Sequence, residues 1–223
     1  MKPWVTLAED TAPDGRKLVL QQRDDEQVIR MGGQVLMSSR QHGSEEAMAA
    51  AALTSHVRPD SAVLVGGLGL GYSLRAVLDR VSPTARITVA ELFPAVVRWN
   101  RGPLAPLAGA PLGDARVTVY EGDVRALVER SERAFDAILL DVDNGPSALT
   151  KSSNAQLYDR TGLSRLHRAL RPQGRLVVWS AGPDAAFVRR LTEVGFTASD
   201  QTVPARDASA GARHVLFIAE RSS

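Results

Sequence analysis

Apolar segments alternate with amphipathic segments along most of this chain, and this alternation restricts the fold more than any other feature. From Ser61 onward, short apolar runs typical of buried strands are separated by segments with helical periodicity. The strand-like runs are AVLVG, ITVAE, RVTVYEG, DAILLDV, RLVVWS and HVLFIAE. Because right-handed crossovers place helices on both faces of a parallel sheet, the pattern predicts an α/β fold with a parallel sheet.

The residues before this alternation have a different pattern. The runs KLVLQQR and QVIRMGGQVLMSS have β-strand character, and the Asp-Asp pair at 24–25 and the Gly-Gly pair at 32–33 indicate turns. These features predict a small antiparallel appendage. We therefore expect two parts: an N-terminal β-strand appendage over residues 1–43 and a larger domain over residues 44–223.

A helix is predicted at the start of the larger domain. Ser44 is a suitable N-cap residue, and Glu45 and Glu46 follow it where a first helical turn favours negative charge. The continuation EEAMAAAALTSH is rich in strong helix formers. This segment is therefore expected to cross from the appendage to the first strand of the parallel sheet.

Composition argues against several classes of protein. The 223 residues include no cysteine, and the four histidines lack the spacing of metal ligands, so we expect no metal site. No stretch approaches the roughly 18 apolar residues of a membrane span, and the first residues have charges where a signal peptide is apolar. The arginines are scattered among acidic residues, so nucleic acid is not an expected partner. We predict a cytoplasmic protein without a membrane partner.

The segment VLVGGLGLGYSLR passes from a strand to a helix through Gly67, Gly69 and Gly71. No lysine follows these glycines, so the segment is not a GxxxxGK[ST] phosphate loop, and Tyr72 replaces the last glycine of a dinucleotide fingerprint. A GxGxG turn remains. It either brings bare backbone close to a ligand or serves only as a tight turn.

Acidic residues follow the next three predicted strands. Glu91 ends the second strand, at the sheet edge where ligands of open α/β folds bind, and it could accept hydrogen bonds from both ribose hydroxyls. Gly122 and Asp123 follow the third strand; the carboxylate could accept from an adenine amino group or cap the next helix. Asp141 ends the fourth strand, where it could hold or deprotonate an amine or cap a loop.

These strand ends resemble the class I S-adenosylmethionine-dependent transferases, and among them the spermidine synthases, which are polyamine aminopropyltransferases. The resemblance covers roughly residues 16–220. It implies a Rossmann-like class I methyltransferase fold with a seven-stranded, mostly parallel sheet, a β-rich N-terminal part and a homodimer. It implies S-adenosylmethionine or its decarboxylated form as co-substrate, bound by Gly67, Gly69, Gly71, Glu91, Leu92, Gly122 and Asp123, with Asp141 as the catalytic residue.

The chain departs from this family where substrate amines would bind. Leu70 stands where the family has the aspartate that binds the amine of the decarboxylated donor, and Asn144 stands for its second acceptor-binding aspartate. A carboxylate about 4 Å from an ammonium gains on the order of 4 kcal/mol of gross Coulomb energy at an effective dielectric of 20, which neutral side chains cannot supply. Methyl transfer and aminopropyl transfer therefore both remain open.

The acceptor is expected to be a small molecule that contains an amine. Asn144, Tyr158 and His42 are the candidate acceptor-binding residues, and Trp179 is the tryptophan placed nearest to the site. The family's Tyr-His-Glu segment, which helps to hold the diamine, is matched here by residues 44–46, without the tyrosine. One alternative is a catalytically inactive nucleoside-binding or regulatory protein. A nucleic-acid methyltransferase is disfavoured because no aromatic residue stands where a flipped base could stack.

Overall fold

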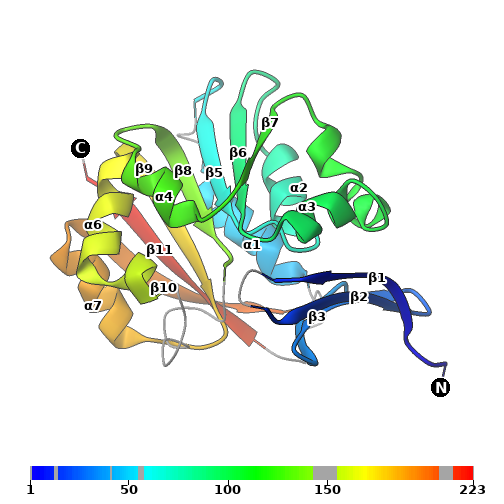
Figure 1. Cartoon of the computed structure of the whole chain (residues 1–223). Helices are drawn as coiled ribbons and strands as arrows, with labels where there is room; N and C mark the ends of the chain where they lie inside the picture. Colours follow the sequence, from blue (N-terminus) through cyan, green and yellow to red (C-terminus); the bar gives the residue numbers. More distant parts are fainter. Residues whose placement is uncertain are drawn as a thin grey trace.

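Two β-sheets organise the part of the chain that the structure describes (Figure 1). The structure is a computed structural model, and it describes residues 2–12, 15–40, 42–54, 58–142, 155–205 and 213–222. The larger sheet has the strand order β10-β11-β9-β8-β5-β6-β7. Its strands are β5 (Ala62–Gly66), β6 (Arg86–Glu91), β7 (Val117–Glu121), β8 (Phe135–Leu140), β9 (Leu170–Ser180), β10 (Phe196–Pro204) and β11 (Arg213–Arg221).

Among the described strands of this sheet, β11 is the one that runs opposite to all the others. It pairs antiparallel with both β9 and β10, whereas the pairs β5–β6, β5–β8, β6–β7 and β8–β9 are parallel. The predicted α/β fold with a seven-stranded, mostly parallel sheet is therefore confirmed. All five residues of β5 are buried, as expected for a central strand that is covered on both faces.

The helices cover the large sheet on both faces. Buried residues of α1, α2 and α3 belong to one hydrophobic cluster, and those of α4, α5, α6 and α7 belong to a second cluster on the other face. The helices are α1 (Gly43–Ala52), α2 (Tyr72–Leu78), α3 (Pro94–Asn100), α4 (Val124–Glu129), α5 (Ala155–Tyr158), α6 (Arg160–Ala169) and α7 (Ala185–Glu193), and two short 3₁₀ helices are η1 (Ala105–Ala108) and η2 (Pro111–Gly113).

Strand β10 was not assigned from the sequence pattern. Its residues FTASDQTVP form no continuous apolar run, because β10 is the last strand on its side of the sheet and only Phe196 and Val203 are buried. An edge strand with polar side chains leaves little periodic signal. Such side chains also protect an unpaired edge from association with other strands.

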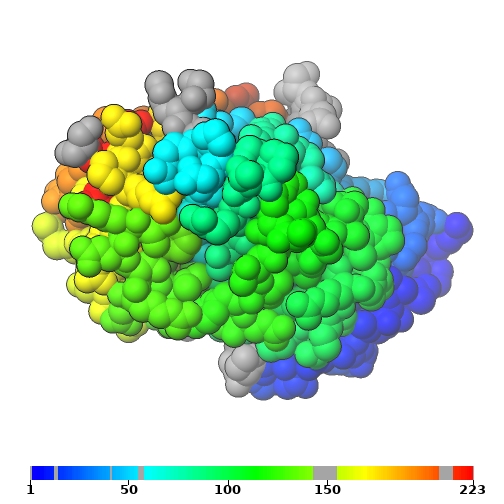
Figure 2. Space-filling model, turned by 90° about the horizontal axis from the view of Figure 1, so that it is seen from above, coloured from blue at the N-terminus to red at the C-terminus, as the bar shows by residue number. Residues whose placement is uncertain are grey.

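The N-terminal part forms a separate antiparallel sheet of four strands in the order β1-β2-β3-β4. The strands are β1 (Val5–Thr11), β2 (Lys17–Arg23), β3 (Glu26–Met31) and β4 (Gln34–Ser38), so β1 extends the predicted appendage. Leu18, Leu20 and Ile29 belong to the same buried cluster as Val63 of the central strand β5. The core is therefore continuous between the two sheets, while the small sheet occupies one end of the molecule (Figure 2, blue).

The path of the chain places a binding crevice beside β5. The chain leaves β5 toward β6 and β7 on one side, and β8 later pairs with the other side of β5. In open α/β sheets, ligands bind at the carboxyl ends of the strands where the strand order reverses in this way. The small sheet lies next to this edge (Figure 1), and Met37 of β4 approaches Gly69 in the turn after β5.

Candidate active site

The glycine turn after β5 has a conformation that other residues rarely adopt. Gly67, Gly69 and Gly71 have φ values of 91°, 53° and 89°. A Cβ on Gly67 would lie 2.1 Å from the backbone oxygen of Asp141, and one on Gly71 would lie 3.0 Å from Oδ1 of Asn100. The first and third glycines are therefore required by the fold itself, whether or not a ligand is bound.

At Gly69 the neighbouring atoms come from the small sheet. A Cβ there would lie 3.0 Å from Sδ of Met37, a flexible side chain on β4. The sequence left open whether the bare backbone here approaches a ligand or serves only as a tight turn. The structure adds Met37 as a direct neighbour, and the contact with a ligand stays a prediction.

Two buried side chains, Glu91 and Asn100, form hydrogen bonds to the backbone of the glycine turn. Oε2 of Glu91 accepts a hydrogen bond from the Leu68 amide at 2.9 Å, and Oε1 accepts one from the Phe93 amide at 2.8 Å. The Asn100 side-chain amide donates to the Gly69 carbonyl at 2.8 Å. Burial raises the pKa of Glu91, although the backbone hydrogen bonds act in the opposite direction.

Glu91 is close to several backbone amides at once. Besides the amides of Leu68 and Phe93, those of Gly69 and Leu92 also act to lower its pKa. The side chain is buried, at 6% exposure, so in this structure its carboxylate holds the glycine turn. Hydrogen bonds from ribose hydroxyls to Glu91 stay a prediction. The adjacent Leu92 is 43% exposed and flanks the same strand end.

Asp123, after β7, caps helix α4, which is one of the two roles predicted for it. Its Oδ1 accepts from the Arg125 amide at 2.8 Å, and its Oδ2 pairs with the Arg125 guanidinium. Burial opposes ionisation of Asp123, but the hydrogen bonds from Arg125 outweigh it and lower the pKa. The Gly122 amide donates to the Glu91 carbonyl at 2.8 Å, which joins the ends of β6 and β7. An adenine contact at Gly122 and Asp123 stays a prediction.

Asp141 has a carboxylate neighbour that the sequence did not indicate. Its Oδ2 accepts a hydrogen bond from the Ser73 hydroxyl at 3.3 Å, and burial raises its pKa to about 6. Glu45 of α1 lies close enough to feel its charge: burial, and then the Asp141 carboxylate, raise the pKa of Glu45 to about 7. The charge of Asp141, after β8, thus disfavours ionisation of Glu45 in the first turn of α1.

The predicted N-cap role of Ser44 is wrong. Helix α1 begins at Gly43, His42 stands in the N-cap position, and no side chain caps the helix there. Ser44 is inside the first turn and is 2% exposed. Its hydroxyl donates to Oε2 of Glu45 at 2.7 Å, so it orients a carboxylate rather than a backbone amide.

Two aromatic side chains from the large sheet also reach Ser44. Nε1 of Trp179, near the end of β9, donates to the Ser44 oxygen at 3.2 Å, and Nδ1 of His214, near the start of β11, lies 3.1 Å from it. The two rings meet edge to face, with centroids 4.6 Å apart. Trp179 therefore packs beside Glu45. His214 lies next to it at the start of the predicted strand HVLFIAE, where no sequence motif marked it as a site residue.

The candidate acceptor-binding residues fall in different places. His42 stacks on Tyr72 with ring centroids 4.5 Å apart, next to the start of both α1 and α2. Tyr158 is 1% exposed and meets Phe187 edge to face in the second core cluster. The structure thus places Tyr158 in the core, and its contact with the acceptor stays a prediction. Asn144 lies outside the described residues.

Sequence reasoning missed the contribution of α1 to the site. Glu45 was noted as a helix-start residue and as part of the segment matched to the family's Tyr-His-Glu, but it was not assigned to the site. Ser73 and His214 were not assigned either, because their meeting depends on how α1 packs against α2 and the strand ends. The signal that could have found Glu45 is its place in the segment that matches the diamine-binding part of the spermidine synthases. No local spacing connects it with Asp141.

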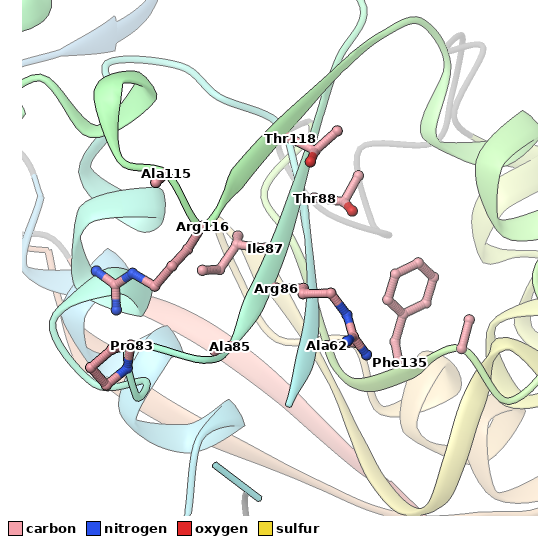
Figure 3. Close-up of a pocket in the computed structure, with 11 residues that line it drawn as sticks. Ala62, Pro83, Ala85, Arg86, Ile87, Thr88, Ala115, Arg116, Thr118 and Phe135 are labelled. Atoms are coloured by element: carbon pink, nitrogen blue, oxygen red, sulfur yellow. The ribbon is translucent and has the colours of Figure 1, made fainter. Parts of the chain in front are cut away.

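A surface hollow in the described part of the chain lies at the opposite edge of the sheet. It has a volume of about 480 Å³, and its lining includes Ala62, Arg86 and Phe135, the first residues of β5, β6 and β8 (Figure 3). Amino ends of parallel strands are not where such folds bind ligands. We therefore place the candidate site at the glycine turn and the carboxyl groups of Glu45 and Asp141.

The described residues contain neither a candidate metal site nor a candidate membrane-spanning helix. No three or more histidine, aspartate or glutamate side chains gather there in a way that could hold a metal ion. No helix in the same residues combines the length and apolar character that crossing a membrane requires.

The fold and the arrangement of strand ends are those of a methyltransferase-like α/β fold. The glycine turn, the acidic end of β6 and the acidic end of β8 meet at the strand-order reversal of such a sheet. Residues 41–185 match the family model described as the spermine/spermidine synthase domain. The chain therefore belongs to the spermine/spermidine synthase family.

Curated relatives support this assignment. The chain is 35% identical over 127 residues to polyamine aminopropyltransferase 1 of Streptomyces coelicolor, a match that covers 56% of this chain and 23% of that protein. It is 29% identical over 140 residues to the polyamine aminopropyltransferase of Korarchaeum cryptofilum, covering 63% and 40%, respectively. The chain thus matches less than half the length of these relatives.

Solved structures show the same fold. Spermidine synthase from Thermotoga maritima superposes with a TM-score of 0.77 at 16% identity, covering 97% of this chain and 72% of that one. A spermidine synthase in complex with the transition state analogue AdoDATO gives a TM-score of 0.75 at the same identity and coverage. At such low identity the likeness concerns the fold alone.

Proposed function

We propose that this protein transfers an aminopropyl group from decarboxylated S-adenosylmethionine to a small amine. The proposal chiefly rests on two carboxyl groups on elements that pack together: Glu45 of α1, held by the Ser44 hydroxyl, and Asp141 after β8, held by the Ser73 hydroxyl of α2. A protonated amine is attracted to such a pair, and its nitrogen must lose a proton before it can form a new bond to carbon. Membership of the spermine/spermidine synthase family supports the same reaction class.

The donor nucleoside fits the edge formed by the glycine turn and β6. We assign its ribose hydroxyls to Glu91, which ends β6 beside the glycine turn, and its neighbouring atoms to the bare backbone at Gly67 and Gly69. Leu92, Gly122 and Asp123 would flank the base. The bound donor supplies an electrophilic carbon next to a sulfonium ion.

Glu45 offers a substitute for an acidic residue that the sequence lacks. Asn144 replaces the family's second acceptor-binding aspartate, which suggested weak diamine binding. The Glu45 carboxylate of α1, whose ionisation the charge of Asp141 opposes, supports a substitute for that group. We infer that Glu45 binds the acceptor ammonium and that its charge offsets part of the loss at position 144.

Asp141 is then the group that receives the proton. Its carboxyl pKa of about 6 makes it a stronger base than an ordinary aspartate, and it can still be ionised at neutral pH. When the acceptor nitrogen forms its bond to the aminopropyl carbon, the bond from that carbon to sulfur breaks and methylthioadenosine leaves. The proton lost by the amine is held at Oδ1 or Oδ2 of Asp141.

Product analysis tests this function directly. Purified protein is incubated with decarboxylated S-adenosylmethionine and, separately, with putrescine, cadaverine, agmatine and spermidine, and mass spectrometry follows methylthioadenosine and aminopropylated amines. We expect product with at least one amine, and slower turnover with putrescine than in a family member with both aspartates. No aminopropylated product from any amine, in protein that binds the donor by calorimetry, contradicts the proposal.

Methyl transfer is the second candidate, and Leu70 is the observation that favours it. Its side chain is 5% exposed and packs in the core of the first cluster, so this position has no carboxylate for the donor amine. The loss also removes a repulsion that would reject the carboxylate of ordinary S-adenosylmethionine. Tighter binding of S-adenosylmethionine than of its decarboxylated form, with methylated product, would establish this alternative.

A further inference from the structure

A single hydroxyl group joins three side chains at the candidate site. Ser44 has one proton and two lone pairs, and its oxygen lies within hydrogen-bond distance of Glu45, Trp179 and His214. These partners come from α1, β9 and β11, so the contact depends on the tertiary fold. Ser44 itself is 2% exposed.

The hydrogen inventory determines the direction of each bond. The indole of Trp179 can only donate, so it occupies one lone pair of the Ser44 oxygen. An ionised Glu45 can only accept, so the hydroxyl proton points to Oε2. The remaining lone pair must receive a proton from His214, whose Nδ1 therefore carries hydrogen while Nε2 is left as the acceptor in the neutral ring.

From this geometry we propose that Ser44 and His214 are positioning residues that aim the Glu45 carboxylate at the acceptor amine and hold it in its ionised form. This role rests on the proposed function, because it assigns the acceptor amine to Glu45. Two donors, Nδ1–H and Nε1–H, polarise the hydroxyl toward the carboxylate. In a partly buried site such a chain of bonds strengthens its charged end.

Other groups around Glu45 act on the same carboxylate. Asp141 and Glu46 oppose its ionisation by their charges, whereas the Ser44 hydroxyl favours it. The His42 ring stacks on the Tyr72 ring. Burial raises the pKa of Tyr72, and the charge of Glu45 raises it further. Burial lowers the pKa of His214, so the ring is neutral at pH 8 and its tautomer can be observed.

Nuclear magnetic resonance tests the hydrogen bonds that join His214, Ser44 and Glu45 without relying on catalysis. In ¹⁵N-histidine-labelled protein at pH 8, with the signal assigned by its loss in His214→Phe, we expect the Nδ1–H tautomer for His214. In ¹³C-glutamate-labelled protein, Ser44→Ala should move the Glu45 carboxyl titration up by about 1 pH unit. His214→Phe should move it in the same direction by less. Ser131→Ala, which removes another buried serine hydroxyl, should leave it in place.

Two results would overturn the proposal. One is an Nε2–H tautomer for His214 in the folded protein at pH 8, and the other is an unchanged Glu45 titration in both Ser44→Ala and His214→Phe. In an active enzyme, Ser44→Ala should also move the acidic limb of kcat/KM upward by the same amount. Absence of amine transfer together with the expected spectra would contradict the proposed function and leave the hydrogen-bond chain intact.

Discussion

Replacing Glu45 by glutamine should stabilise the protein increasingly as the pH rises. In the folded protein the pKa of Glu45 is raised from 4.5 to about 7, so the fold retains a proton that the unfolded chain has lost. The stabilisation from this proton is complete below pH 4.5 and disappears as the pH rises through about 7. Glutamine cannot ionise, and its oxygen can still accept from Ser44, so the variant avoids this loss.

The size of the effect follows from the same values. A rise from 4.5 to about 7 corresponds to about 3 kcal/mol at 1.36 kcal/mol per pKa unit. Most of this free energy is lost above pH 5, because the unfolded carboxylate is already mostly ionised there while the folded one is still protonated. The free energy of unfolding of Glu45→Gln, relative to wild type, should therefore increase by about 2 kcal/mol between pH 5 and pH 8.

Urea unfolding followed by circular dichroism at pH 5, 6, 7 and 8 measures this difference. Glu46→Gln is the matched control, because it removes the same charge from an exposed neighbour in the same helical turn. Its relative stability should change by less than about 0.5 kcal/mol over this range. Parallel pH curves for Glu45→Gln and wild type would show that Glu45 ionises as freely in the fold as in the unfolded chain, which would refute the argument.

Three further substitutions test other parts of the site. Asp141→Asn should reduce turnover of whichever group is transferred by at least about 100-fold while donor affinity stays within twofold, measured by kinetics and calorimetry; full activity would exclude Asp141 as the base. Glu91→Ala should weaken methylthioadenosine binding by roughly 1.5 to 3 kcal/mol in calorimetry, and unchanged affinity would remove Glu91 from the ribose site. Gly67→Ala should lower the thermal midpoint by several degrees, because the new Cβ would clash with the Asp141 carbonyl; an unchanged midpoint would contradict that packing.

The sequence was sufficient to predict the parallel sheet and the residues that follow its strands. Buried strands such as β5 and β8 are continuous apolar runs, and the residues that follow them are fixed in place by the direction of the strand. Glu91 and Asp141 could be placed for that reason. The polar edge strand β10 and the terminal strand β1 could not, since their partly exposed side chains produce no clear period.

Contacts between distant elements were beyond the reach of local patterns. Ser44 has the composition and position of a helix cap, yet the helix begins one residue earlier and tertiary contacts with Trp179 and His214 decide where its hydroxyl points. The approach of Glu45 to Asp141 likewise follows from how α1 packs on the sheet. Tyr158, a candidate acceptor-binding residue, ends the short helix α5 as a buried side chain, a position that no local pattern indicated, and its contact with the acceptor stays a prediction.

The approach of Met37 to Gly69 makes the small N-terminal sheet part of the edge proposed to bind the donor. Among the described strands β4 pairs only with β3, and the register of this pair already shifts between Ile29 and Arg30. A slip of one residue in β4 would turn Met37 to the other face of its sheet and uncover the glycine turn. Insertions or deletions in the hairpin between β3 and β4 are therefore a route by which donor preference could change during evolution while every residue of the large sheet is conserved.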